Sequence, residues 1–194
     1  MPFSPRQLEI LNAATKLIAE GGIQSCTIKR VAEAVGVSEP ALYRHFPNKN
    51  AIIHGLLENF SEFDSNVTDV EGRSAWENLA EFLDDRFLRF ANNPNLAKVM
   101  ITDGSFQNDP EMILALKKAM MRNHSRTMQW IMDGQNQCII RKDIPSKEVF
   151  RMVAGAMRLT VTQWIMSDFA FDLQVEGKAM TLALGKVLAP CQAT

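Results

Sequence analysis

The chain has 194 residues, of which 46% are hydrophobic and 22% are charged, and its formal net charge is −1. This length suits one domain, or a small domain joined to a larger one, and the apolar share excludes a wholly disordered chain. The three cysteines, Cys26, Cys138 and Cys191, lie far apart at no metal-ligand spacing, and their odd number argues against a disulfide framework. Because no segment approaches the roughly 20 apolar residues of a membrane span and the N-terminus makes a poor signal peptide, we expect a cytoplasmic protein.

The charge is unevenly distributed along the chain. The first 50 residues hold six Lys or Arg and four acidic residues, whereas the remaining 144 hold 15 Lys or Arg and 18 acidic residues. The positive excess is small, but it lies at the N-terminal end.

The predicted secondary structure is helical almost throughout. A capping box of Ser4 and Gln7, with Pro5 at the first helical position, predicts a helix that ends at Gly21-Gly22. After two shorter helices within residues 27–46, apolar spacing and chain breaks predict helices at about 49–62, 76–90, 96–101, 110–134, 147–168 and 175–188. Residues 64–72 are polar and without a period, so we predict a linker there. The expected fold class is therefore all-α, with about nine helices.

The two shorter helices have the pattern of a helix-turn-helix unit around Gly36. Thr27 caps the first, and Ser38 caps the second, which ends near Phe46 and carries Pro40 in its first turn. Such a unit needs a short turn, usually with glycine, and small or apolar residues where the helices meet. The inward-facing residues are expected to be Ile28, Val31, Ala32, Val35, Val37, Leu42 and Phe46.

The other faces of these helices are suited to a polyanion. The helix N-termini at Thr27 and Ser38 present backbone N–H groups and a positive dipole end to an anion. Polar side chains that can reach phosphates or base edges follow at Tyr43, Arg44, His45 and Lys49. A glycine between two amphipathic helices also occurs in many helical bundles, so a purely structural helix pair is the alternative.

The stretch TIKRVAEAVGVSEPALYRHFPNK, residues 27–49, resembles the TetR family of one-component transcriptional regulators. The matching positions are Thr27, Val31-Ala32, Val35-Gly36-Val37-Ser38, Leu42-Tyr43, His45-Phe46 and Lys49. Beyond about the first 60 residues, only the helical layout and the chain length match. The resemblance implies a three-helix DNA-binding domain with the helix-turn-helix over residues 1–48, and a helical effector-binding and dimerisation domain over residues 49–194.

The resemblance also implies roles for individual residues. The expected DNA-binding residues are Thr27, Lys29, Arg30, Ser38, Glu39, Pro40, Ala41, Tyr43, Arg44, His45 and Lys49. Glu39 and Pro40 depart from the family, in which a small or basic residue and then Gly or Ala are common. An acid at this position can accept a hydrogen bond from a cytosine amine, repel phosphate, or pair with a nearby base, so the motif leaves the operator sequence open.

TetR-like proteins are dimeric, usually through their last two long helices, which here are residues 147–168 and 175–188. The first of these carries apolar residues on more than one face, and Gly155 and Ala156 allow close approach of another helix. A two-faced helix needs a second partner, such as its symmetry mate. A helix buried within one chain is the alternative.

The resemblance further implies a small-molecule site in the C-terminal domain. When this site is occupied, the fourth helix moves and the distance between the two DNA-binding domains of the dimer changes. Eleven Met residues and several large aromatics suit an adaptable apolar pocket. The expected lining residues are Phe60, Phe63, Trp76, Leu83, Phe87, Met100, Ile101, Phe106, Met120, His124, Met128, Met157, Val161 and Trp164. Each of these alone is as readily a core residue, and His124 is either a core histidine or a polar anchor for the ligand.

We therefore expect a ligand-responsive repressor that binds a palindromic operator in double-stranded DNA as a homodimer and is released by a small hydrophobic effector. The alternative is a TetR-like DNA-binding adaptor that acts mainly through a protein partner. An enzyme is not expected, because the sequence has no Gly-rich phosphate loop, no nucleophile elbow and no HExxH spacing. We expect no cofactor and no metal, since the three histidines are scattered and have no acid or cysteine at ligand spacing.

Overall fold

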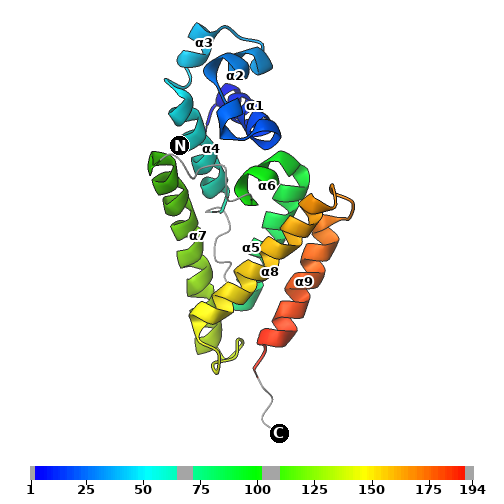
Figure 1. Cartoon of the computed structure of the whole chain (residues 1–194). Coiled ribbons are helices and arrows are strands. Elements are labelled where there is room, and N and C mark those ends of the chain that lie inside the picture. Colours follow the sequence, from blue (N-terminus) through cyan, green and yellow to red (C-terminus); the bar gives the residue numbers. More distant parts are fainter. Residues whose placement is uncertain (1–2, 65–71, 102–109, 191–194) are drawn as a thin grey trace. The chain divides into compact units, whose positions relative to one another are not determined.

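The structure is a computed structural model that describes residues 3–64, 72–101 and 110–190. Within these ranges the side chains of helical residues 61–64, 110–113, 115–116, 118–120 and 122–123 are not described. The helices are α1 (Pro5–Gly21), α2 (Ile28–Val35), α3 (Glu39–Tyr43), α4 (Lys49–Asp64), α5 (Ala75–Asn92), α6 (Pro94–Ile101), α7 (Pro110–Asn136), α8 (Ser146–Met166) and α9 (Leu173–Leu188) (Figure 1). A short 3-10 helix, η1 (Ile23–Ser25), follows α1. The all-helical prediction is confirmed for the described ranges.

Most predicted helix boundaries agree with the structure to within two residues. The exception is α3, which ends at Tyr43 rather than near Phe46. The backbone N–H of Phe46 still bonds the Leu42 carbonyl at 3.0 Å, so the chain makes one further turn before Pro47. The predicted linker at residues 64–72 lies almost wholly outside the described residues.

Local capping accounts for the starts of the N-terminal helices. In α1 the Ser4 hydroxyl accepts from the Gln7 N–H at 3.3 Å, and the Gln7 side chain accepts from the Ser4 N–H at 3.0 Å. The hydroxyl of Thr27 accepts from the Arg30 N–H at 3.2 Å, and that of Ser38 accepts from the Ala41 N–H at 3.4 Å. These bonds satisfy amide groups that have no partner inside a helix, and they confirm the predicted caps.

A second capping box, which the sequence analysis did not identify, begins α5. The Glu77 N–H donates to the Ser74 hydroxyl at 3.2 Å, and the Glu77 carboxylate accepts from the Ser74 N–H at 2.7 Å. The hydrogen bonds from the Ser74 backbone and hydroxyl lower the pKa of Glu77 below its ordinary value. The sequence SAWE follows the capping-box pattern, so this helix start was predictable.

The chain divides into two compact units, which are described separately here. The first unit consists of residues 1–63 and 98–121, and the second of residues 64–97 and 122–194. These units are defined by contacts within the chain. The predicted functional division after residue 48 stays a prediction.

The first unit has a single apolar core. Its members come from α1 to α4, the segments between them and the end of α6, namely Ile10, Leu11, Ala14, Ile18, Cys26, Val31, Ala32, Leu42, Phe46, Ile52, Ile53, Leu56, Leu57 and Val99. Gly36 ends α2 in the left-handed conformation, with φ of 70°, which a residue without Cβ adopts at little cost. This turn lets α3 fold back on α2, so that Leu42 is completely buried.

The second unit is organised around α5, which packs against α9 and α8. The close approach of α9 depends on glycine, because a Cβ at Gly177 would lie 2.3 Å from the buried Phe87 ring. A Cβ at Gly185 would lie 3.0 Å from the Trp76 ring. Two aromatic side chains of α5 therefore occupy space that α9 leaves open.

Candidate functional site

The residues expected to bind DNA all lie in the first unit, and most of them are accessible. Nine of them are exposed, namely Thr27, Lys29, Arg30, Ser38, Glu39, Pro40, Tyr43, Arg44 and His45. Ala41 and Lys49 are partly buried. Tyr43 is 48% exposed, whereas Leu42 beside it is fully buried. The short helix α3 is therefore anchored by one face while its polar residues face outward, an arrangement that matches the reading helix of a helix-turn-helix.

Cys26, which the sequence analysis considered only as a disulfide or metal-ligand candidate, belongs to the core of the first unit. Its side chain is fully buried in the core of the first unit. Burial raises the pKa of the Cys26 thiol, and the nearby Lys49 ammonium partly opposes that rise. A buried, protonated thiol is inert, so Cys26 is a core residue. The charge of Lys49 lies close to this core at the start of α4.

The expected effector-lining residues are distributed over both units. Phe60, Met100 and Ile101 belong to the first unit, and the members in the second are Trp76, Leu83, Phe87, His124, Met128, Met157, Val161 and Trp164. The side chains of Phe63, Phe106 and Met120 lie outside the described residues. The role of this set in ligand binding stays a prediction.

Within the second unit, several of these residues have a clear packing role. Leu83, Phe87 and Val161 are at most 2% exposed. The Trp164 indole N–H donates to the Phe171 carbonyl at 2.9 Å and so holds the turn between α8 and α9. His124 is exposed, and its ring contacts Phe150 edge to face at a centroid distance of 4.4 Å. His124 is therefore not a core histidine.

Two arginines and two aromatic rings form a cluster between α5 and α7 that the sequence analysis missed. The guanidinium carbon of Arg86 lies 4.9 Å from the Phe82 ring centre, and that of Arg126 lies 5.1 Å from the Trp130 ring centre. The two rings are 5.6 Å apart. Arg86 is buried, although it carries a charge. The sequence did contain a sign of this burial, because Arg86 lies on the apolar stripe of α5 between Leu83 and Phe90.

We call these four residues, Phe82, Arg86, Arg126 and Trp130, the Arg–aromatic cluster. Aromatic faces attract cations, so the two rings help to hold positive charge inside a mainly apolar unit. Burying a charge is costly unless it is compensated. The Arg–aromatic cluster therefore brings the positive charges of two arginines together with two aromatic rings inside the second unit.

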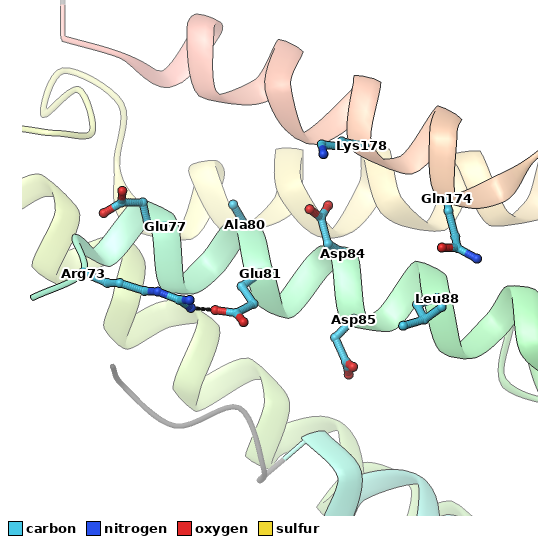
Figure 2. A pocket seen from close by; sticks show the side chains of 9 residues that line it. All are labelled: Arg73, Glu77, Ala80, Glu81, Asp84, Asp85, Leu88, Gln174 and Lys178. Carbon is cyan, nitrogen blue, oxygen red and sulfur yellow. Dashed lines mark ion pairs between the residues drawn. The ribbon is translucent and has the colours of Figure 1, made fainter. Parts of the chain in front are cut away.

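A groove between α5 and α9 has the opposite character (Figure 2). Its lining residues are Arg73, Glu77, Ala80, Glu81, Asp84, Asp85, Leu88, Gln174 and Lys178, and Arg73 forms an ion pair with Glu81. Figure 2 shows the Asp84 carboxylate on α5 directed toward Lys178 on α9. Burial raises the pKa of Asp84, and Lys178 together with a hydrogen bond to Thr181 opposes that rise. Because acidic groups predominate here, an anionic or apolar effector is not expected in this groove.

The described residues hold neither a candidate metal site nor a candidate membrane-spanning helix. No group of three or more His, Cys, Asp or Glu residues among them is arranged to hold a metal ion. In the same part of the chain, no helix is both long enough and apolar enough to cross a bilayer.

Comparison with known proteins identifies the family. The model of the bacterial regulatory proteins of the TetR family matches residues 10–56, and that of the YsiA-like C-terminal region matches residues 57–184. This chain belongs to the TetR family. The match of the first model covers the exposed reading surface described above, so the predictions of a DNA-binding transcription regulator and of a protein that is not an enzyme are confirmed.

Relatives within the family are named for different functions. The fatty acid metabolism regulator protein of Bacillus subtilis (strain 168) is 25% identical over 173 residues, 87% of this chain and 88% of that protein. The nucleoid occlusion factor SlmA of Vibrio vulnificus (strain YJ016) is 39% identical over 175 residues, again 87% and 88%. The crystal structure of the regulator FadR from Bacillus subtilis in complex with stearoyl-CoA has a TM-score of 0.76 and 24% identity, covering 91% of this chain and 96% of that one. The structural likeness shows a shared fold.

Proposed function

We propose that this TetR-family protein is a dimeric repressor that binds a palindromic operator and is released by a long-chain acyl-CoA. The observation that carries the proposal is the similarity over most of the chain to a fatty acid metabolism regulator. Together with the YsiA-like match over residues 57–184, it extends through the effector domain, where TetR-family proteins differ most.

In this proposal, the first unit binds the operator through the surface around α3. Lys29, Arg30, Arg44 and Lys49 supply positive charge for phosphates, while Glu39 and its neighbours meet base edges. The second helix of a helix-turn-helix enters the major groove with its N-terminal residues first. The exposure of nine of the eleven expected DNA-binding residues and the burial of Leu42 support this arrangement.

Replacing Lys49 with Ala is expected to weaken binding to all DNA sequences and to reduce the slope of log K against log salt by about one unit. The physical reason is that one phosphate contact fewer releases about one counterion fewer. The slope is measured by titration of a labelled duplex at several salt concentrations. Lys142→Ala is the matched control, because Lys142 is an exposed lysine of the second unit. An unchanged slope for Lys49→Ala would exclude a direct phosphate contact.

The proposed effector combines an acyl chain with an anionic head. The second unit has apolar side chains for the first and cationic side chains for the second. Met128 on α7 and Met157 on α8 are half-buried flexible apolar side chains. The Arg–aromatic cluster supplies positive charge from Arg86 and Arg126 in the same unit. A relative crystallised with stearoyl-CoA has the same fold, which makes this ligand the first to test.

Stearoyl-CoA is expected to release the protein from its operator and to raise its free energy of unfolding by about 2.7 kcal/mol at a free concentration of 100 Kd. The stabilisation follows because a ligand that binds only the folded chain shifts the folding equilibrium. Fluorescence anisotropy on a labelled operator and thermal unfolding measure the two effects. The operator is first located by footprinting on the DNA that flanks the protein's own coding region.

Free CoA and stearate, added separately at the same concentration, are the ligand controls. Arg126→Gln is expected to weaken the response to stearoyl-CoA, whereas Arg151→Gln is not, since Arg151 is an exposed α8 residue paired with Glu148. Release of DNA without any thermal stabilisation would be a detergent effect. That result would contradict the proposed effector.

An adaptor that acts through a protein partner is the second candidate function. A relative that is 39% identical over most of the chain is named a nucleoid occlusion factor, SlmA, which is a role other than the regulation of fatty acid metabolism. A protein of that kind is expected to remain on its DNA sites in the presence of every acyl-CoA. The anisotropy experiment therefore separates the two candidates.

A further inference from the structure

We propose that Glu39 recognises a cytosine in each operator half-site by accepting a hydrogen bond from the exocyclic N4 amine of that base. This inference rests on the proposed DNA-binding function and specifies what one residue of that surface reads. It selects one of the three roles that the sequence leaves open for an acid at this position.

The placement of Glu39 suits contact with the floor of the groove. It is the first helical residue of α3, directly after the cap Ser38, and its side chain is exposed. A side chain on a helix leans toward the N-terminus, so that of Glu39 projects ahead of the helix. A reading helix enters the major groove with this end first. The buried Leu42 fixes the opposite face of the helix in the core.

The carboxylate of Glu39 is available for such a contact. Among the ion pairs and hydrogen bonds of the described residues, none involves this side chain. The cations Lys29, Arg30 and Arg44 of the same unit are also exposed, and in the proposed function they attract phosphates. The negative charge of Glu39 at the start of α3 weakens the attraction to phosphates. A hydrogen bond from a donor group on a base to this carboxylate would offset that loss of binding energy.

The chemistry of the base edges favours cytosine over the other bases. An ionised carboxylate only accepts hydrogen bonds, which disfavours the major-groove edge of guanine and the O4 of thymine, because both present acceptors. The amines of cytosine and adenine both donate. The adenine amine lies between two acceptors, its own N7 and the O4 of the paired thymine. The cytosine amine has an acceptor, the guanine O6, on one side only, so a carboxylate meets less repulsion there.

The first experiment selects binding sites from a random duplex library with the full-length protein. Wild type is expected to prefer one C·G pair in each half-site by about tenfold over the other pairs. Glu39→Ala is expected to lose the preference at that position alone. Glu39→Gln is expected to shift it toward adenine, because an amide can donate to N7 while accepting from N6. Thermal unfolding of each variant confirms that it is folded.

The second experiment removes the amine instead of the carboxylate. The preferred cytosine is replaced by 2-pyrimidinone, which lacks the 4-amino group, in an otherwise unchanged operator. Wild type is expected to lose about tenfold in affinity, and Glu39→Ala is expected to bind both duplexes equally. The same replacement at a cytosine outside the preferred position serves as the control for altered duplex stability.

The outcomes that overturn the inference differ from those that overturn the proposed function. A protein that selects no sequence at all fails as a regulator of any operator. A selective protein whose ranking of bases is unchanged in Glu39→Ala contradicts the reading role only. A uniform rise in affinity for every sequence in Glu39→Gln contradicts it too, because the acid then acts by repelling phosphates.

Discussion

Replacing Leu182 with Glu is expected to convert the protein from a dimer to a monomer and to weaken operator binding by about a hundredfold or more. Leu182 on α9 is 60% exposed and Leu159 on α8 is 58% exposed. Apolar side chains at helical spacing on two neighbouring helices form a surface that a second copy of the chain would cover. An ionised Glu in the centre of that interface would lose its hydration without gaining a partner.

In the proposed function, operator affinity depends on this interface because a dimer would bind both half-sites at once. A monomer binds one half-site and loses the gain from the linked second contact. Sedimentation velocity gives the oligomeric state, and fluorescence anisotropy on the labelled operator gives the affinity. Leu88→Glu is the matched control, since Leu88 is also exposed and apolar but lies on α5.

A second variant tests the same interface without adding a charge. Apart from the backbone of α8 itself, a Cβ at Gly155 would meet nothing within 4 Å among the described residues, so Gly155→Leu is expected to leave the fold intact. The added side chain would separate two copies that pack closely at this point. If both Gly155→Leu and Leu182→Glu remain dimers with unchanged operator affinity, the dimer forms through another surface.

Replacing Gly177 with Ala is expected to destabilise the protein by about 1–3 kcal/mol. At an open helical position, this change would stabilise by up to about 1 kcal/mol, because alanine is the better helix former. At Gly177 the new Cβ would lie 2.3 Å from Cδ2 of Phe87. The Phe87 ring is 1% exposed, so it cannot move aside into solvent, and α9 must shift away from α5.

Urea unfolding of the four proteins of a double-mutant cycle shows whether contact with Phe87 causes the destabilisation by Gly177→Ala. Phe87→Ala removes the ring atoms Cγ, Cδ2 and Cε2 that the new Cβ would meet, so Gly177→Ala is expected to cost much less in that background. Equal costs in the two backgrounds would show that the destabilisation does not arise from contact with Phe87. The experiment also tests whether glycine sets the spacing between α5 and α9.

Signals within four residues made the N-terminal half of the fold predictable. Ser4, Thr27 and Ser38 cap their helices as expected, because a cap is a hydrogen bond between a side chain and an amide two or three residues later. Gly36 adopts its left-handed turn for an equally local reason. The family signature could be recognised for the same reason, because core-facing residues and the residues expected to face DNA alternate along two short neighbouring helices.

The candidate effector residues were less predictable, as Arg86 and His124 show. Arg86 was passed over as a charged residue, yet the structure buries it beside Phe82. His124 had been open between a core residue and a ligand anchor, and it is exposed against Phe150. In both cases the outcome depends on side chains from another helix, which helical periodicity in one segment does not specify.

By itself, the sequence determined the number of α-helices in the described ranges and most of their boundaries, because caps, turns and apolar periods act over a few neighbouring residues. Only the tertiary structure decided which apolar residues are covered. Val161 is buried while Leu159 is exposed, and Phe87 lies over Gly177 from a helix some ninety residues away in the chain. Burial depends on contacts between segments distant in sequence, and a pattern read within one helix gives its apolar face without naming the partner that covers it.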